Sequence, residues 1–246
     1  MIKLSNIKIS RKNFELNIEK FSIEDGNSIL LLGNSGCGKT TLLKLLSGFV
    51  EKYEGDIHFE NQDATTSIML QNPIDQMITP TVETELKFPL VNRKIDDEII
   101  EKKIEDIAIY FDIINLLKNN LRELSFGELQ KVMLAATFLT NANYYFLDEP
   151  TSHLDHKSTE MLYNYIQKIV KSGKTVIIAS QNFDEYLYSD KTLIMNDGKI
   201  VDYLDSSKIN ENRYRIGKYG LRSSNDEIVR ILHAKTPRRR DKKIIK

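Results

Sequence analysis

The sequence predicts an α/β fold with a mixed sheet, antiparallel strands near the N-terminus and a helical subdomain inserted into the core. Three observations predict it. A short apolar strand at residues 28–32 leads into a glycine-rich loop and then into a helix. Continuous apolar runs at 144–147 and 175–179 are typical of strands buried on both faces of a parallel sheet. Between residues 72 and 143 the pattern instead changes to helical spacing.

The N-terminal part contains two strands, the apolar strand and the glycine-rich loop. Residues 2–9 and 14–23 alternate apolar and polar side chains, as antiparallel strands do. The loop at residues 33–40 reads Gly-Asn-Ser-Gly-Cys-Gly-Lys-Thr and matches G-x-x-x-x-G-K-[ST] at every fixed position. We expect the next helix to leave the loop at Thr41 and to stop near Gly48.

This loop has the chemistry of a phosphate-binding site. Glycines let backbone N–H groups turn toward phosphates, and the helix N-terminus adds a partial positive charge. We expect Lys39 to reach the β- and γ-phosphates and Thr40 to ligate Mg²⁺. The sequence therefore predicts a P-loop NTPase core that binds a nucleoside triphosphate. The predicted nucleotide-binding residues of the loop are Gly33, Asn34, Ser35, Gly36, Cys37, Gly38, Lys39, Thr40 and Thr41.

The middle of the chain is predicted to hold two more strands and the helical subdomain. Residues 56–59 and 67–70 have strand character. Apolar side chains recur at helical spacing from Ile100 to Phe111, with Asp96 or Asp97 as the N-cap, and a second helix is expected at about 127–139. We expect the helical subdomain to span about residues 73–142.

The last third returns to an α/β pattern. The strand at 144–147 precedes a helix whose apolar face is expected to pack in the core; that face comprises Met161, Leu162, Tyr165, Ile166 and Ile169. The strand at 175–179 follows, and residues 193–201 form a predicted hairpin with an Asp-Gly turn. We expect one domain over residues 1–205 and an extension with a basic tail over 206–246.

Composition limits the function classes. Lys+Arg and Asp+Glu number 35 each in 246 residues, so no net charge draws the chain to nucleic acid. The basic tail at 238–243 is expected to be solvated, with attraction to anionic lipid as the alternative. The single cysteine excludes an internal disulfide and fits a reducing cytosol. No apolar run is long enough to span a bilayer, so a membrane role is expected to depend on a partner.

Two acids follow the strand at 144–147, in the run Asp148-Glu149-Pro150. A carboxylate at the end of a buried strand can hold Mg²⁺ through water, and its neighbour can take a proton from an attacking water. Asp148 and Glu149 are the candidates for these roles. For Cys37, the helix N-terminus is expected to lower the thiol pKa, so that a thiol reagent inactivates the protein and ATP protects it.

Two further segments carry a family resemblance. Leu124-Ser125-Phe126-Gly127-Glu128 resembles the Leu-Ser-Gly-Gly-Gln signature of ATP-binding-cassette (ABC) proteins, and Thr151-Ser152-His153-Leu154-Asp155 resembles their D-loop. With the acidic pair between them, residues 1 to about 205 resemble an ABC ATPase. The resemblance implies a head-to-tail dimer in which Ser125, Phe126, Gly127 and Glu128 complete the nucleotide site of a partner, next to the D-loop residue Asp155.

The resemblance also assigns roles to single residues. Glu149 is implied as the general base, with Gln71 and Gln181 as the other catalytic residues; Thr40, Gln71 and Asp148 are implied around Mg²⁺. Phe14 is the candidate for stacking on adenine, and a core position in its strand is the alternative.

The sequence departs from the family pattern at two places. Phe126 and Glu128 replace a glycine and the glutamine of the signature, but Ser125 and Gly127 remain, so the signature is expected to work. Gln181 stands where the family has its switch histidine. A neutral amide can donate a hydrogen bond but cannot carry positive charge, so we expect slow turnover with binding intact. The alternative is that glutamine substitutes adequately.

Among ABC proteins, the run Gln71-Asn72-Pro73-Ile74-Asp75-Gln76 and the segment 81–86 resemble the energy-coupling-factor and cobalt-type importers. Gly220-Leu221-Arg222 and a short helix after it resemble their C-terminal extension, which helps dimerisation. This implies a peripheral subunit on the cytoplasmic face, bound to a transmembrane subunit and to an identical or related second ATPase. A separate membrane component captures a vitamin or metal ion, so the ATPase makes no contact with the substrate. A peptide or drug exporter, a soluble ABC ATPase and a regulatory cassette with little turnover are the alternatives.

Overall fold

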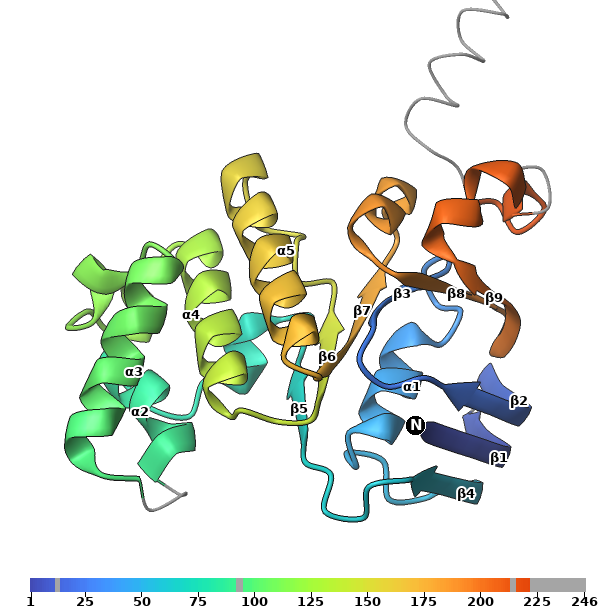
Figure 1. Cartoon of the computed structure of the whole chain (residues 1–246), viewed down its shortest axis with the longest axis horizontal. Helices are drawn as coiled ribbons and strands as arrows, with labels where there is room; N and C mark the ends of the chain where they lie inside the picture. The colour runs from blue at the N-terminus through green and yellow to red at the C-terminus, as the bar shows by residue number, and fades with distance from the viewer. Residues whose placement is uncertain (12–13, 92–94, 213–215, 222–246) are drawn as a thin grey trace, which may run out of the picture.

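The computed structural model describes residues 1–11, 14–91, 95–212 and 216–221, and within these ranges the strands form two sheets (Figure 1). The first sheet is antiparallel and has the order β2 (Phe14–Ile23), β1 (Ile2–Arg11), β4 (Glu54–Phe59). The sequence predicts these antiparallel strands, but they lie in a sheet of their own rather than in the central one.

The second sheet has six strands and carries the carboxyl ends that build the site. Its order is β5 (Thr66–Met69), β6 (Tyr144–Asp148), β7 (Thr175–Ser180), β3 (Ser28–Leu32), β8 (Lys191–Asn196), β9 (Lys199–Asp205). All neighbours are parallel except β8 and β9, which form the predicted hairpin. Every residue of β3, β6 and β7 is buried, which explains their continuous apolar runs.

Helix α1 (Lys39–Leu46) leaves the glycine-rich loop and lies between the two sheets (Figure 1). Its buried leucines belong to one apolar cluster with residues of β1, β2, β6 and β7. Helix α5 (His156–Lys171) contributes to a different cluster, in which Leu162, Tyr163, Ile166 and Val170 are buried. The predicted core face of this helix is confirmed, because Met161, Tyr165 and Ile169 also pack against that cluster.

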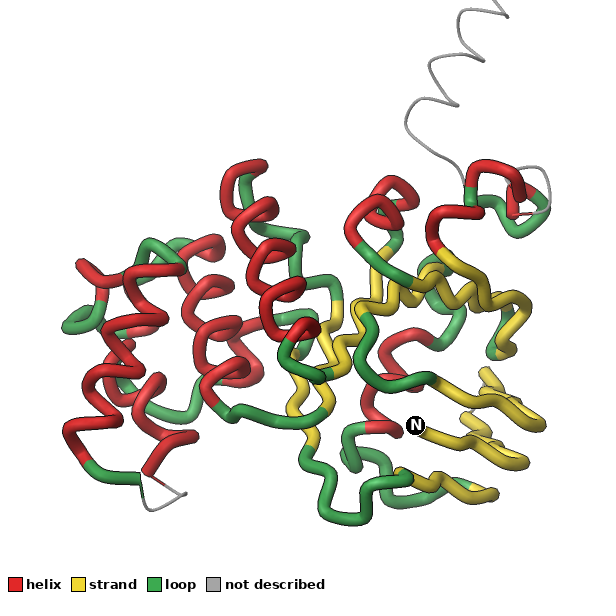
Figure 2. The backbone as a smooth tube through the Cα atoms, viewed as in Figure 1, coloured by secondary structure: helices red, strands yellow, loops and turns green. Residues whose placement is uncertain are grey.

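Helices α2 (Val82–Val91), α3 (Asp97–Tyr110) and α4 (Phe126–Leu139) gather at one end of the molecule, away from the antiparallel sheet (Figures 1 and 2). Their buried faces join the α5 cluster. The single-turn 3₁₀ helices lie at Pro73–Gln76, Ile114–Leu116, Leu121–Glu123, Ser206–Lys208 and Asn210–Asn212, and a longer one, η4, at Phe183–Tyr188. None of the helices in the described ranges combines the length and apolar character that crossing a membrane requires.

Few described residues follow β9. Ile209, Ile216 and Leu221 are buried against Leu30 and Leu32 of β3. The basic tail and the helix expected after Gly220 lie outside the described residues. The domain boundaries at 73, 142 and 205 stay predictions.

Candidate functional site

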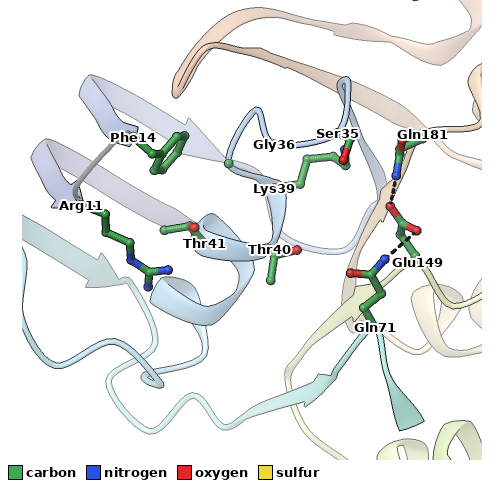
Figure 3. A pocket seen from close by; sticks show the side chains of 11 residues that line it. Arg11, Phe14, Ser35, Gly36, Lys39, Thr40, Thr41, Gln71, Glu149 and Gln181 are labelled. Carbon is green, nitrogen blue, oxygen red and sulfur yellow. Dashed lines mark hydrogen bonds between the residues drawn. The ribbon is translucent and has the colours of Figure 1, made fainter. Parts of the chain in front are cut away.

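A cavity of about 280 Å³ lies at the carboxyl ends of the parallel strands (Figure 3). Four adjacent strands each lead into it, in the order β5, β6, β7, β3. Gln71 follows β5, Glu149 follows β6, Gln181 follows β7, and the glycine-rich loop follows β3. The lining residues are Arg11, Phe14, Ser35, Gly36, Gly38, Lys39, Thr40, Thr41, Gln71, Glu149 and Gln181. This edge of an open parallel sheet is where α/β folds bind ligands.

Glycines shape the loop at the points where a side chain cannot fit. Gly36 and Gly38 have φ of 78° and 108°, a region that L-residues avoid. A Cβ atom at Gly38 would also lie 2.6 Å from Cζ of Phe14. The Phe14 ring therefore packs against the loop, at the end of the cavity opposite Glu149 (Figure 3).

Lys39 is the buried cation of the loop. Its side chain is 5% exposed, and Nζ donates hydrogen bonds to the carbonyl oxygens of Gly33, at 2.5 Å, and Asn34, at 3.1 Å. Both acceptors are neutral carbonyl oxygens, so these two bonds do not neutralise the positive charge. The ammonium lies at the cavity wall, where anionic oxygens can attract it.

Thr40 and Asp148 form a hydrogen-bonded pair of oxygen-bearing side chains beside the loop. The Thr40 hydroxyl donates to Oδ2 of Asp148 at 2.7 Å. Burial raises the pKa of the Asp148 carboxyl, while the hydrogen bond from Thr40 lowers it and the nearby Glu149 raises it. The structure therefore brings together these two residues, both predicted to act around Mg²⁺.

Glu149 stands at the centre of the predicted catalytic residues (Figure 3). Gln181 Nε2 donates to its Oε1 at 2.5 Å, and Gln71 Nε2 donates to its Oε2 at 3.1 Å. Its backbone N–H donates to the carbonyl of Ala179 at 2.9 Å. Two residues that are distant in sequence, Gln71 and Gln181, thus meet at the carboxylate of Glu149. Both amides orient that carboxylate without neutralising its charge.

Other predicted loop residues point away from the cavity. The Asn34 amide donates to the carbonyl of Tyr219 at 2.8 Å, which ties the loop to the C-terminal described residues. Cys37 is 5% exposed, and burial raises the pKa of its thiol more than Lys39 lowers it. The expectation of a lowered thiol pKa is therefore wrong, because removal from water outweighs the helix N-terminus. Inactivation by a thiol reagent stays a prediction. Gly33, Asn34 and Cys37 do not line the cavity.

The signature and D-loop residues do not line the cavity either. Ser125 caps α4: its hydroxyl accepts from the N–H of Glu128 at 3.3 Å, and the Glu128 carboxylate accepts from the Ser125 N–H at 2.8 Å. The ring of Phe126 packs on that of His153, with centroids 4.8 Å apart. Asp155 caps α5 by accepting from the N–H of Ser158 at 2.7 Å.

Sequence reasoning missed Arg11, which also lines the cavity. Arg11 lies directly opposite Phe14 in the register of β1 and β2, so both side chains lie on the same face (Figure 3). The available signal was a basic residue at the end of the first strand, three positions before Phe14. Arg11 reaches the cavity only because β1 and β2 pair in this register, and the sequence pattern does not specify that register.

Comparison with known proteins identifies the family. Residues 16–152, more than half of the chain, match the family model described as ABC transporter. The energy-coupling factor transporter ATP-binding protein EcfA1 of Mycoplasma pneumoniae is 31% identical over 191 residues, which cover 74% of this chain and 70% of the relative.

Two solved structures share the fold. One is cbiO1 from Clostridium perfringens, described as part of the ABC transporter complex cbiONQ, with a TM-score of 0.74, 24% identity and coverage of 95% of this chain and 97% of that one. The other is an ATP-binding cassette in a dimeric post-hydrolysis state with ADP and Pi; its TM-score is 0.75, at 20% identity, over 84% of this chain and 99% of that one. The chain belongs to the ABC transporter family and is an ATPase subunit of that family.

Proposed function

We propose that the chain binds Mg·ATP in the cavity at the sheet edge and hydrolyses it, as one of two ATPase subunits that drive an energy-coupling-factor-type importer. The observation that carries the catalytic part is the Glu149 carboxylate, held by the amides of Gln71 and Gln181 beside the phosphate loop. The importer class is supported by the likeness to a relative named as an energy-coupling factor transporter ATP-binding protein. A vitamin or a metal ion is the proposed cargo.

The cavity suits a nucleoside triphosphate from end to end. Phe14 offers an aromatic face for adenine at one end, and the loop from Ser35 to Thr41 offers backbone N–H groups for the phosphates. Lys39 would exchange its two carbonyl acceptors for phosphate oxygens. The γ-phosphate would then lie near Glu149, at the other end.

The residues present fit Mg²⁺. Thr40 and Asp148 place two oxygen ligands 2.7 Å apart, and no group of three or more His, Cys, Asp or Glu suited to a metal occurs among the described residues. Mg²⁺ prefers such sparse oxygen ligation and completes its shell with waters and substrate phosphates. Thr40 would ligate the ion directly, with Asp148 and Gln71 acting through water. When bound, the ion would neutralise part of the charge on the phosphates.

Glu149 is proposed as the general base. A carboxylate with both oxygens hydrogen-bonded to amides has a fixed orientation, and it can still accept a proton from a water near the γ-phosphate. Gln71 and Gln181 would be the groups that place the carboxylate and that water. Positioning of this kind provides much of the rate acceleration in phosphoryl transfer.

A second ATPase subunit would complete each site. The cavity contains no residue from 125–128, although Ser125 and Gly127 stand at the N-terminus of α4, where N–H groups and the helix dipole favour an anion. We infer that this end of α4 serves the γ-phosphate bound by a partner chain, as in the head-to-tail arrangement expected from the signature. The partner is a second copy or a related subunit.

The membrane subunit would bind in a second cavity, of about 340 Å³, between α2, α4 and the segment after β5. Its rim includes Ile78, which is 63% exposed, and Phe88, which is 40% exposed. Gln76 connects this cavity to the catalytic side, because its amide bridges the carbonyl of Ile68 and the N–H of Leu70, directly before Gln71. A helix bound in this cavity would therefore move together with Gln71, through Gln76.

Copurification tests this assignment. The tagged full-length chain, expressed in its native host and extracted with mild detergent, is expected to retain an integral membrane protein of the energy-coupling-factor type and a second ABC ATPase. Phe88→Glu places a charge on the apolar rim and should release the membrane protein while ATP binding remains. An exporter subunit, or only soluble or nucleic-acid partners, identified by mass spectrometry, would contradict the importer assignment.

Gln181→His is expected to raise ATP turnover of the assembled complex about 10- to 100-fold with ATP affinity unchanged. A protonated histidine adds a charge-assisted hydrogen bond in the transition state, worth about 1.5–3 kcal/mol. Steady-state phosphate release measures the effect, and Gln181→Leu, which removes the amide that donates to Glu149, is the matched control and should be slower than the natural chain. An unchanged rate for Gln181→His means that glutamine substitutes adequately.

A further inference from the structure

The two residues after Glu149 are each held by a buried polar side chain. Gln130 Nε2 donates to the carbonyl of Pro150 at 2.9 Å. The hydroxyl of Thr151 donates to Oε1 of Glu185 at 2.7 Å. Gln130 is fully buried, and Glu185 is 4% exposed. Neither residue lines the nucleotide cavity.

The two side chains reach this segment from different parts of the fold. Gln130 belongs to α4, the helix that begins at the signature. Glu185 belongs to η4, which starts two residues after Gln181. Pro150 is therefore hydrogen-bonded to α4, the helix that begins at the signature, and Thr151 to η4, which follows Gln181.

The backbone at Glu149 needs such support. Its φ is 49°, in the left-handed region that a non-glycine residue adopts only at an energetic cost. Such a conformation persists where neighbouring contacts over-determine it. The N–H of Glu149 is bonded to Ala179, and the following two residues are bonded by Gln130 and Glu185.

Folding stability alone does not account for Glu185. A buried carboxylate is costly unless its oxygens are hydrogen-bonded, and an apolar replacement is often neutral or stabilising. Oε2 of Glu185 is buried with no hydrogen-bond partner among the described residues. Burial and the neighbouring Glu185 also raise the pKa of Tyr163, whose ring stacks on Tyr188. The Glu185 side chain accepts the hydrogen bond from Thr151 through Oε1 and lies beside the buried hydroxyl of Tyr163.

We propose that Glu185 is a positioning residue: its bond to Thr151 holds the chain after Glu149 against the Gln181 segment, and so keeps the Glu149 carboxylate at the distance from Gln181 that hydrolysis requires. The inference rests on the proposed role of Glu149 as general base. It adds a residue outside the cavity whose loss affects the chemical step rather than nucleotide binding.

The test measures kcat, ATP affinity and thermal unfolding for Glu185→Ala, Glu185→Gln and Thr151→Val in the full-length chain within its assembled complex. Glu185→Ala is expected to lower kcat about 10- to 100-fold, since a displacement of about 1 Å costs that much, with the Kd for ATP unchanged. Thr151→Val should have a similar effect. Glu185→Gln keeps a carbonyl oxygen for the Thr151 hydroxyl and should restore most of kcat.

A double-mutant cycle separates positioning from packing. Glu185→Ala combined with Thr151→Val should be no slower than either change alone, because both remove the same bond. Asp190→Asn is the matched control: this carboxylate also links two segments, through the N–H and hydroxyl of Ser28 at 2.8 and 2.6 Å, but Ser28 begins β3 at the end away from the cavity. It should lower the unfolding temperature and leave kcat unchanged.

Two results would overturn the inference. One is a normal kcat in Glu185→Ala and Thr151→Val proteins that are folded. The other is an equal loss of kcat in Asp190→Asn, which would make the effect a general loss of stability. If Glu185→Ala does not fold, Thr151→Val and Glu185→Gln still decide. The proposed function is tested separately: it is rejected if Glu149→Gln retains ATP turnover. If Glu149→Gln loses turnover while the Glu185 and Thr151 variants keep a normal kcat, only the positioning role is rejected.

Discussion

Glu149→Gln is expected to lower ATP turnover about 10²- to 10⁴-fold, the range attributed to a general base. The amide is nearly the same size as the carboxylate, so the cavity keeps its shape, but an amide cannot take a proton from water. One of its atoms becomes a donor that faces Gln71 or Gln181, both of which now donate to Glu149. Phosphate release and the Kd for ATP, measured on the same protein, separate loss of chemistry from loss of binding.

The same variant should accumulate the ATP-bound pair of subunits. If ATP holds two cassettes together and hydrolysis releases them, a chain that binds but does not hydrolyse remains associated. Size-exclusion chromatography or light scattering with Mg·ATP measures this, in the presence of the sister subunit where the pair is mixed. Glu160→Gln, on the exposed surface of α5, is the control and should turn over normally. A Glu149→Gln protein that stays monomeric with ATP and its partners contradicts the shared-site proposal.

Lys39→Ala is expected to reduce ATP affinity about 10- to 100-fold and to abolish ATP turnover. The change deletes a cation whose charge-assisted hydrogen bonds to phosphate are worth about 1.5–3 kcal/mol. The structure places the ammonium at the cavity wall, where it donates to the carbonyl oxygens of Gly33 and Asn34. Exchange of these weak acceptors for phosphate oxygens is the gain that the variant loses.

Titration calorimetry with ATP, ADP and AMP gives the measurement. The loss should be large for ATP and small for AMP, because Lys39 is proposed to contact the β- and γ-phosphates. Lys52→Ala, which removes an exposed lysine outside the cavity, should bind all three nucleotides as the natural chain does. Equal losses for ATP and AMP would mean that Lys39 supports the fold of the loop rather than the phosphates.

The parts of the site that sequence predicts are those set by local pattern. The phosphate loop and the acidic pair at Asp148 and Glu149 depend on consecutive residues. Gln71 and Gln181 are assigned by the family resemblance, and each follows a predicted strand. Parallel strands bring their carboxyl ends to one edge, so the meeting of these residues follows once the strand order is known. Features that depend on a few consecutive residues can therefore be predicted from the sequence alone.

The parts that sequence does not predict depend on contacts between distant segments. The hydrogen bonds of Gln130 to Pro150 and of Glu185 to Thr151 form only when α4 and η4 both lie beside the segment that follows β6. The sequence predicts the thiol of Cys37 at a helix N-terminus, but burial in the core raises its pKa. Helix α2 contains Pro89 and therefore has a weak local signal; only its packing with α3 and α4 defines it.

Because the strands form two separate sheets, a bound nucleotide can link parts of the protein that share no strand pairing. Phe14 and Arg11 come from the antiparallel sheet, whereas Gln71, Glu149 and Gln181 come from the parallel one, and all of them border one cavity. A nucleotide bound as proposed would contact both sheets, with its base on Phe14 and its phosphates near Glu149. A free base or a free triphosphate would contact only one of the two sheets, so the whole nucleotide is expected to link them more firmly than either part.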